Sequence, residues 1–175
     1  MKLILSLYLI ALWSLTSFGQ TVTDISKTKK AVQNGIEITT FESKPYTGVV
    51  TENYPNGKPK TWITMKNGLA NGQWQEWLEN GNLRYNSYWK DSKGHGLWQY
   101  FHDNGKLKYE ESYLLDIPNG ISRQYYDNGQ LKSDFFWLQG KKQGVWTSYS
   151  ETGVLLKTEI YDDNKLVSTT QVKKE

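Results

Sequence analysis

The chain of 175 residues has no cysteine, so disulfide bonds and thiolate metal sites are excluded. Histidine occurs only twice, as His95 and His102, and we expect both to be exposed turn residues rather than metal ligands or general bases. The formal net charge is only +3, which gives no reason to expect a nucleic-acid partner. No stretch has a helical apolar period with caps, so almost no helix is expected.

The residue patterns of common catalytic sites are also missing. The serines lack a nucleophile elbow, and no glycine-rich phosphate loop precedes a helix. Two pairs of carboxylates recur 24 residues apart, Glu52 with Glu76 and Glu110 with Asp134. The members of a pair would lie about 10 Å apart, which suits an inverting glycosidase, but nothing else marks a cleft. We therefore expect no enzyme and no catalytic, cofactor-binding or metal site.

The first nineteen residues differ from the rest of the chain. Lys2 gives a short basic start, residues 3–15 are apolar apart from two serines, and small residues stand at Ser17 and Gly19. The run is too short for a comfortable membrane span, which needs about 20 residues. We expect a signal peptide over residues 1–19, cleaved before Gln20, and a periplasmic or extracellular protein. An uncleaved N-terminal anchor is the alternative.

The remainder of the chain is built from a repeat with a fixed period. Glycine recurs every 24 residues, at Gly48, Gly72, Gly96, Gly120 and Gly144. A second glycine follows nine residues later in each unit, at Gly57, Gly81, Gly105, Gly129 and Gly153. Asparagine precedes this second glycine in four units, and Thr152 precedes it in the fifth. A period in this range indicates a repeat architecture.

Each unit predicts one β-hairpin. In the third unit, strands over roughly residues 97–102 and 106–114 flank the turn at residues 103–105. Asn-Gly between apolar strands is a strong hairpin signal, and it fits either a two-residue type I′ loop or a three-residue loop with a bulge. The connection to the next hairpin reads as longer and variable. The predicted fold is all-β, an elongated single-layer antiparallel β-meander of five 24-residue hairpin repeats, about 48 Å long.

These patterns divide the chain into four segments. Residues 1–19 are the signal peptide, and residues 20–45 are a polar leader with a capping strand. We expect residues 20–34 to be mobile, and residues 36–41 to form a strand that covers the first edge of the sheet. Residues 46–162 are the repeat array. Residues 163–175 are a terminal edge strand and tail, whose threonine and lysine content suits an exposed edge.

Aromatic side chains occupy fixed positions of the repeat and predict a core. One column lies two residues after the opening glycine and includes Trp74, Trp98 and Trp146. A second lies three residues further on and includes Trp77, Phe101, Tyr125 and Tyr149. A third lies seventeen residues after the glycine and includes Trp89, Tyr113, Trp137 and Tyr161. Rings in these columns can form ladders that serve as the core of a single-layer sheet, and the opening glycines leave room for a ring from the adjacent strand. We expect Trp98, in the middle, to contribute more than Trp146, nearer the end.

The repeat resembles the MORN repeat variant family. Residues 126–131 and 137–146 match its pattern almost throughout, and the resemblance extends from Tyr46 to Tyr161. Pro59 and Thr152 depart from the pattern. Bacterial proteins of this type are often labelled YwqK-like antitoxins, so the resemblance implies a non-catalytic, toxin-neutralising protein binder. Other members are associated with membranes or lipids.

We therefore expect an extracytoplasmic, monomeric module that binds a protein, either a toxin or an envelope protein. The alternative is an envelope structural protein that binds glycan or lipid. The predicted contact surface is the aromatic face around the central repeats together with an unusually apolar connection: Trp74, Trp98, Tyr113, Leu115, Ile117, Trp137 and Trp146. A basic column of Lys60, Arg84, Lys108 and Lys132 is either a solvated edge or a contact for anionic lipid or polymer.

Overall fold

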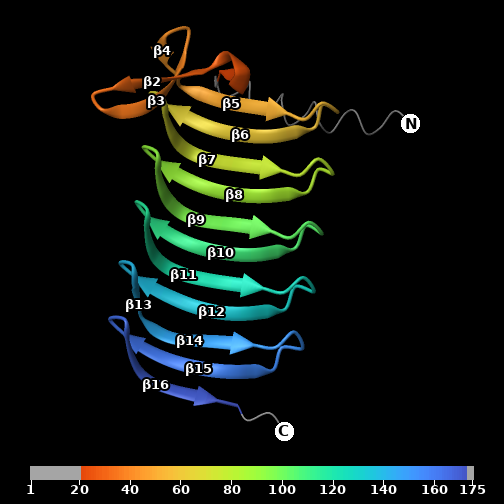
Figure 1. Ribbon diagram of the computed structural model, residues 1–175, viewed down its shortest axis with the longest axis vertical. Coiled ribbons are helices and arrows are strands. Elements are labelled where there is room, and N and C mark those ends of the chain that lie inside the picture. Colours follow the sequence, from red (N-terminus) through yellow and green to blue (C-terminus); the bar gives the residue numbers. More distant parts are fainter. Residues whose placement is uncertain (1–20, 173–175) are drawn as a thin grey trace.

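The computed structural model describes residues 21–172, which form a tall stack of antiparallel hairpins (Figure 1). The signal peptide predicted over residues 1–19 lies outside the described residues. Within the described part, no helix is long and apolar enough to cross a membrane. The main 13-stranded sheet has the order β1-β5-β6-β7-β8-β9-β10-β11-β12-β14-β15-β16, with β13 paired to β12. The predicted elongated, single-layer antiparallel meander is confirmed.

Each of the five repeats supplies two neighbouring strands of this sheet. The first strands are β5 (Gly48–Asn53), β7 (Leu69–Trp77), β9 (Lys93–Phe101), β11 (Ile117–Tyr125) and β14 (Gly144–Tyr149), with the short β13 (Lys141–Lys142) before the last. The second strands are β6 (Pro59–Lys66), β8 (Leu83–Lys90), β10 (Leu107–Leu114), β12 (Leu131–Leu138) and β15 (Leu155–Asp162). The final strand, β16 (Lys165–Gln171), follows the fifth repeat.

The hairpin tips are three-residue loops with a bulge, one of the two geometries that the sequence left open. In the first repeat, the Gly57 N–H donates to the Tyr54 carbonyl and the Tyr54 N–H donates to the Lys58 carbonyl, both at 2.8 Å. Gly57 has a φ of 82°, the left-handed conformation that closes such a loop. The Asn56 side chain accepts a hydrogen bond from the Lys58 N–H. The same contact recurs at Asn80, Asn104 and Asn128, which explains why asparagine precedes the glycine.

The connections between hairpins are two-residue turns, so the longer connections that the sequence predicted are wrong. Both residues of each turn have positive φ, as in a type I′ turn, at Asn67-Gly68, Asp91-Ser92, Leu115-Asp116, Gln139-Gly140 and Asp163-Asn164. Residues 69–71 and 93–95 extend β7 and β9 instead of forming loops. The N–H of the second turn residue donates to the preceding repeat, for example from Asp116 to the Gly94 carbonyl at 2.8 Å. The turns therefore stack and hold the repeats in register.

The opening glycines explain why these strands continue past the expected loop. Their φ ranges from 70° at Gly144 to 147° at Gly48, and the pairing register of the central repeats shifts beside them. The sequence predicted a ring from the adjacent strand over each opening glycine, and an aromatic residue or Met65 pairs with each: Gly48 with Met65, Gly72 with Trp89, Gly96 with Tyr113, Gly120 with Trp137, and Gly144 with Tyr161. A Cβ at Gly72 would nevertheless meet the Thr64 side chain at 3.1 Å rather than a ring. The glycines thus serve backbone conformation and close approach of the neighbouring strand.

The N-terminal segment over residues 21–45 forms a cap of strands and a turn, where the sequence predicted a mobile leader over residues 20–34. β1 (Val22–Asp24) pairs in parallel with β5 and is followed by a 3₁₀ turn, η1 (Ile25–Lys27). β2 (Lys29–Gln33), β3 (Ile36–Phe41) and β4 (Lys44–Pro45) form a separate three-stranded sheet. The predicted strand over residues 36–41 exists as β3, but β1 covers the first edge of the main sheet instead.

The two ends of the main sheet differ. At the first end, β1 and the small sheet lie beside β5 (Figure 1), and Val49 of β5 is 0% exposed. At the other end, β16 pairs with β15 alone, and all seven of its residues are exposed. The array therefore has a covered edge and, among the described residues, an uncovered one.

Candidate binding groove

One face of the main sheet, here called the ladder face, carries the predicted aromatic columns. Its ring centroids lie 5.4 Å apart for Trp74–Trp89, 4.9 Å for Trp89–Trp98, 4.7 Å for Trp98–Tyr113, 5.0 Å for Trp137–Trp146 and 5.1 Å for Trp146–Tyr161. These separations are typical of attractive aromatic pairs. In the first repeat, Val50, Ile63 and Met65 continue the row as a buried aliphatic cluster. The rings are therefore mainly structural.

The ladder is interrupted at the fourth repeat, where Ser122 is buried in the place of a tryptophan. Beyond this gap, Trp146 is the most enclosed of the described tryptophans, at 7% exposed, whereas Trp98 is half-buried. The Phe135 ring stacks on Trp146 at 4.3 Å, and the Lys142 ammonium lies 4.7 Å from its ring. Trp98 has ring partners on both sides, Trp89 and Tyr113, as the sequence predicted, but it is less buried than Trp146.

A second set of rings on the ladder face forms what we call the tyrosine row, Tyr85, Tyr100 and Tyr109. The centroids of Tyr85 and Tyr100 are 4.7 Å apart, and those of Tyr100 and Tyr109 are 6.1 Å apart. Tyr85 is buried, whereas Tyr100 is 38% exposed. Burial raises the pKa of all three phenols above the ordinary value. The row therefore presents neutral hydroxyl groups and one partly open ring.

The basic column lies beside the tyrosine row, because each member sits at a β-bulge. Tyr100 pairs with Tyr109 and Phe101 pairs with Leu107, so Lys108 has no partner on the opposite strand. The same shift leaves Arg84 and Lys132 as the extra residues of β8 and β12. A bulge turns its extra side chain away from the regular alternation of the strand. This explains how a residue next to Tyr109 in sequence joins it along one groove.

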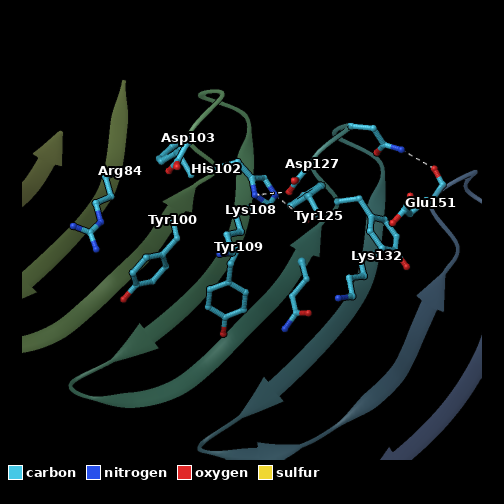
Figure 2. A pocket seen from close by; sticks show the side chains of 14 residues that line it. Arg84, Tyr100, His102, Asp103, Lys108, Tyr109, Tyr125, Asp127, Lys132 and Glu151 are labelled. Carbon is cyan, nitrogen blue, oxygen red and sulfur yellow. Dashed lines mark hydrogen bonds and ion pairs between the residues drawn. The ribbon is translucent and has the colours of Figure 1, made fainter. Parts of the chain in front are cut away.

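Tyr100 and Tyr109 of the tyrosine row and three members of the basic column line a groove of about 1010 Å³ near the hairpin tips. Figure 2 shows Arg84, Lys108 and Lys132 on successive hairpins, with Tyr100 and Tyr109 between them. Gln124 and Tyr126 also line it, and the Lys132 ammonium lies 5.4 Å from the Tyr126 ring. Carboxylates stand along the tip side of the groove, at Asp103, Asp127 and Glu151.

His102 joins two hairpins at the edge of this groove. Its Nε2 lies 3.1 Å from the Tyr125 carbonyl, and its Nδ1 lies 2.8 Å from a carboxylate oxygen of Asp127. Tyr54 and Tyr126 occupy the equivalent position in other repeats, and their hydroxyls donate to the Trp77 and Tyr149 carbonyls. His102 therefore takes the structural place of a tyrosine. It is not the exposed turn residue that the sequence predicted, since its side chain is 14% exposed.

The predicted contact residues separate into two groups. Trp74, Trp98, Tyr113, Trp137 and Trp146 all lie in the ladder. Leu115 is the first residue of a turn at the opposite ends of the strands from the groove, and Ile117 directly follows this turn; they are 41% and 49% exposed. Ile117 pairs with Leu114, the neighbour of Tyr113, so alternation directs it to the reverse face. The structure does not bring the apolar turn and the ladder together on one surface.

Several exposed side chains were missed from the sequence. On the reverse face, Phe136, Val145 and Ile160 are 42%, 56% and 41% exposed, and Val145 pairs with Ile160. Val145 directly follows an opening glycine, so the sequence position after each of these glycines could have indicated part of this exposed group. Tyr100, Tyr109 and Tyr126 of the groove were also missed, because the bulge that gathers them has no signal of its own in the sequence.

Of the paired carboxylates noted in the sequence, Glu52, Glu110 and Asp134 contact basic or phenolic side chains. Arg123 lies between Glu110 and Asp134, at 3.6 Å and 3.2 Å, and Glu110 also accepts a hydrogen bond from Tyr125. Glu52 is bound to Lys60 at 2.7 Å. Within residues 21–172, no group of three potential metal ligands is close enough to hold an ion.

The repeats agree with a known family model. The model described as MORN repeat variant matches the chain five times, at residues 46–67, 70–91, 94–114, 118–138 and 142–163. Together these segments cover more than half of the sequence, and each spans one hairpin. No curated protein matches the chain significantly.

Proposed function

The chain belongs to the MORN repeat variant family, and we propose that it is a non-catalytic binding protein that recognises a protein partner through the groove. The observation that carries the proposal is the groove itself. It combines the partly open Tyr100 ring with basic side chains from three repeats. Tyrosine and arginine are enriched among the residues that carry interface energy.

The ladder supports this proposal indirectly. Its tryptophans stack on one another as the core of a single-layer sheet. They therefore keep the groove rigid, so that it is already formed before a partner binds. A rigid surface loses less conformational entropy when a partner binds. The ladder tryptophans are therefore supporting residues, and the groove side chains make the contacts.

The finer proposal is a toxin-neutralising role outside the cytoplasm. Lys2, the apolar residues 3–15 and the small residues at Ser17 and Gly19 support export with cleavage before Gln20. A mature protein that retains its first residues, as measured by intact mass, contradicts this part. The toxin-neutralising role rests on family resemblance, and a toxin recovered as the partner would establish it.

Capture from an envelope extract tests the proposal. The mature protein is immobilised in three forms: wild type, Tyr100→Ala, and Tyr88→Ala. Tyr88 is a matched control, since it is an exposed tyrosine on the reverse face at the neighbouring strand. We expect a protein that the wild type and Tyr88→Ala retain and that Tyr100→Ala loses, with circular dichroism confirming that all three are folded.

Two results would contradict the proposal. If Leu115→Asp with Ile117→Asp abolishes capture while Tyr100→Ala does not, the interface lies at the apolar turn. If the protein is retained by peptidoglycan or liposomes and captures no protein, the module binds glycan or lipid, the alternative that the sequence left open.

A further inference from the structure

The basic residues of the groove recur at a fixed spacing along the long axis of the sheet. Arg84, Lys108 and Lys132 are each the extra residue of a bulge on the second strand of consecutive hairpins. Consecutive members are therefore two strands apart. Since neighbouring strands lie about 4.8 Å apart, the spacing is about 9.6 Å.

This row of cations has two defined ends. In the preceding repeat, the equivalent Lys60 is bound to Glu52 at 2.7 Å, and this hydrogen bond raises its pKa. In the following repeat, Leu156 takes the bulge position. Among the described residues, Arg84, Lys108 and Lys132 form no ion pair within the chain, so three consecutive cations are left for a ligand.

The spacing selects the conformation of a polypeptide ligand. In a polyproline II helix, every third residue returns to the same face after about 9.3 Å. Over the two intervals between the three cations, the positions of the ligand side chains and of the cations then differ by only about 0.6 Å. A β-strand ligand would direct residues three apart to opposite faces. An α-helix returns to the same face after seven residues and about 10.5 Å, and it is wider.

The remaining lining of the groove also suits such a ligand. Tyr100 and Tyr109 form an aromatic floor beside the cations, and Gln124 supplies an amide. Proline-rich polyproline II segments dock in aromatic-lined grooves, because the preformed helix loses little entropy. The carboxylates of Asp103, Asp127 and Glu151 along the tip side disfavour further acidic groups there.

We propose that the groove binds an extended segment of a partner protein in the polyproline II conformation, with an acidic side chain at every third residue. This inference rests on the proposed function and names the partner segment. Three carboxylates pair with Arg84, Lys108 and Lys132. The intervening residues are proline or other uncharged residues that pack on the tyrosine row.

Synthetic peptides test the inference on the mature protein. One peptide consists of repeated Glu-Pro-Pro units, and a second has the same composition with no two glutamates three residues apart. We expect the periodic peptide to bind at least about tenfold more tightly, the loss that one missing charge-assisted contact produces. Polyglutamate should bind no better than the periodic peptide, because the carboxylates at the tip side repel its other acidic groups.

Protein variants provide the matched controls. Lys108→Gln should weaken binding of the periodic peptide by about tenfold. Lys90→Gln makes the same charge change at an exposed lysine outside the groove and should have little effect. Equal affinity for both peptides, tighter binding of polyglutamate, or equal losses in the two variants would overturn the inference. A groove-dependent protein captured from the envelope extract would still support the proposed function in that case, so the two failures are distinguishable.

Discussion

At the scale of single residues, Leu115 is the one apolar residue in the first position of the five turns that join strands in the array. Its φ is 52°, in the left-handed region, where asparagine and aspartate occupy the equivalent turns at Asn67, Asp91 and Asp163. A left-handed conformation costs most side chains roughly 1–2 kcal/mol, and asparagine tolerates it best. Leu115 is also 41% exposed, so its burial does not offset the strain.

Leu115→Asn should therefore raise the free energy of unfolding by about 1 kcal/mol. Urea titration of the variant and wild type would measure the difference. Gln139 begins another of these turns and has a φ of 50°. Gln139→Asn therefore tests the same backbone effect with little change in apolar surface. A stability loss at Leu115 would show that its exposed side chain packs on the neighbouring turn.

The hairpin tips and the two-residue turns show which conformations the local sequence can specify. The Asn-Gly signal predicted the hairpin tips, because asparagine and glycine each satisfy a local requirement of the loop. Leu115-Asp116 and Asp91-Ser92 carry no such signal, although they adopt the same type I′ geometry as Asn67-Gly68. Their conformation is imposed by stacking on adjacent turns, which is a tertiary effect that the local sequence does not encode.

At the scale of the elements, the ladder determines how strongly each hairpin is held to its neighbours. Trp146 is 7% exposed and contacts the rings of Phe135, Trp137 and Tyr161. Trp146→Ala should lower the free energy of unfolding by about 3–5 kcal/mol, the range for a buried aromatic ring. Trp98→Ala should cost less, because Trp98 is only half-buried. Urea titration of both variants checks the order, and a larger loss at Trp98 would contradict it.

The greater burial of Trp146 than of Trp98 could not be predicted from the repeat period. The columns two and seventeen residues after the opening glycine correctly predicted which rings stack, since their spacing fixes the register of the strands. The column five residues after that glycine, with Trp77, Phe101, Tyr125 and Tyr149, forms no ring pair among the described residues. The columns did not predict burial, because Ser122 interrupts the ladder and Phe135 and Lys142 cover Trp146 from outside the columns. The groove was missed for a similar reason, since it depends on bulges at Arg84, Lys108 and Lys132.

At the scale of the whole molecule, buried phenols make stability depend on alkaline pH. Burial raises the pKa of Tyr85, Tyr109 and Tyr113 above the ordinary value of about 10. Above that pH, the unfolded chain loses protons that the folded protein keeps, so the free energy of unfolding falls. Each buried tyrosine contributes at most about 1.4 kcal/mol per pH unit.

Urea titrations below and above about pH 10 should therefore show a loss of stability on the alkaline side. Tyr85→Phe should flatten this dependence, because it removes the titrating group of the most buried member of the tyrosine row. A free energy of unfolding that stays constant through this range would show that the phenols titrate equally in both states.

The covered edge at β1 and the uncovered edge at β16 differ in how easily a further repeat can be added. A unit inserted at the β1 end would have to preserve the parallel pairing with β5 and the contacts of the small sheet. A unit added after β16 needs only to continue an antiparallel pairing that is already present. A further hairpin is therefore accommodated more readily at the β16 edge than at the β1 edge.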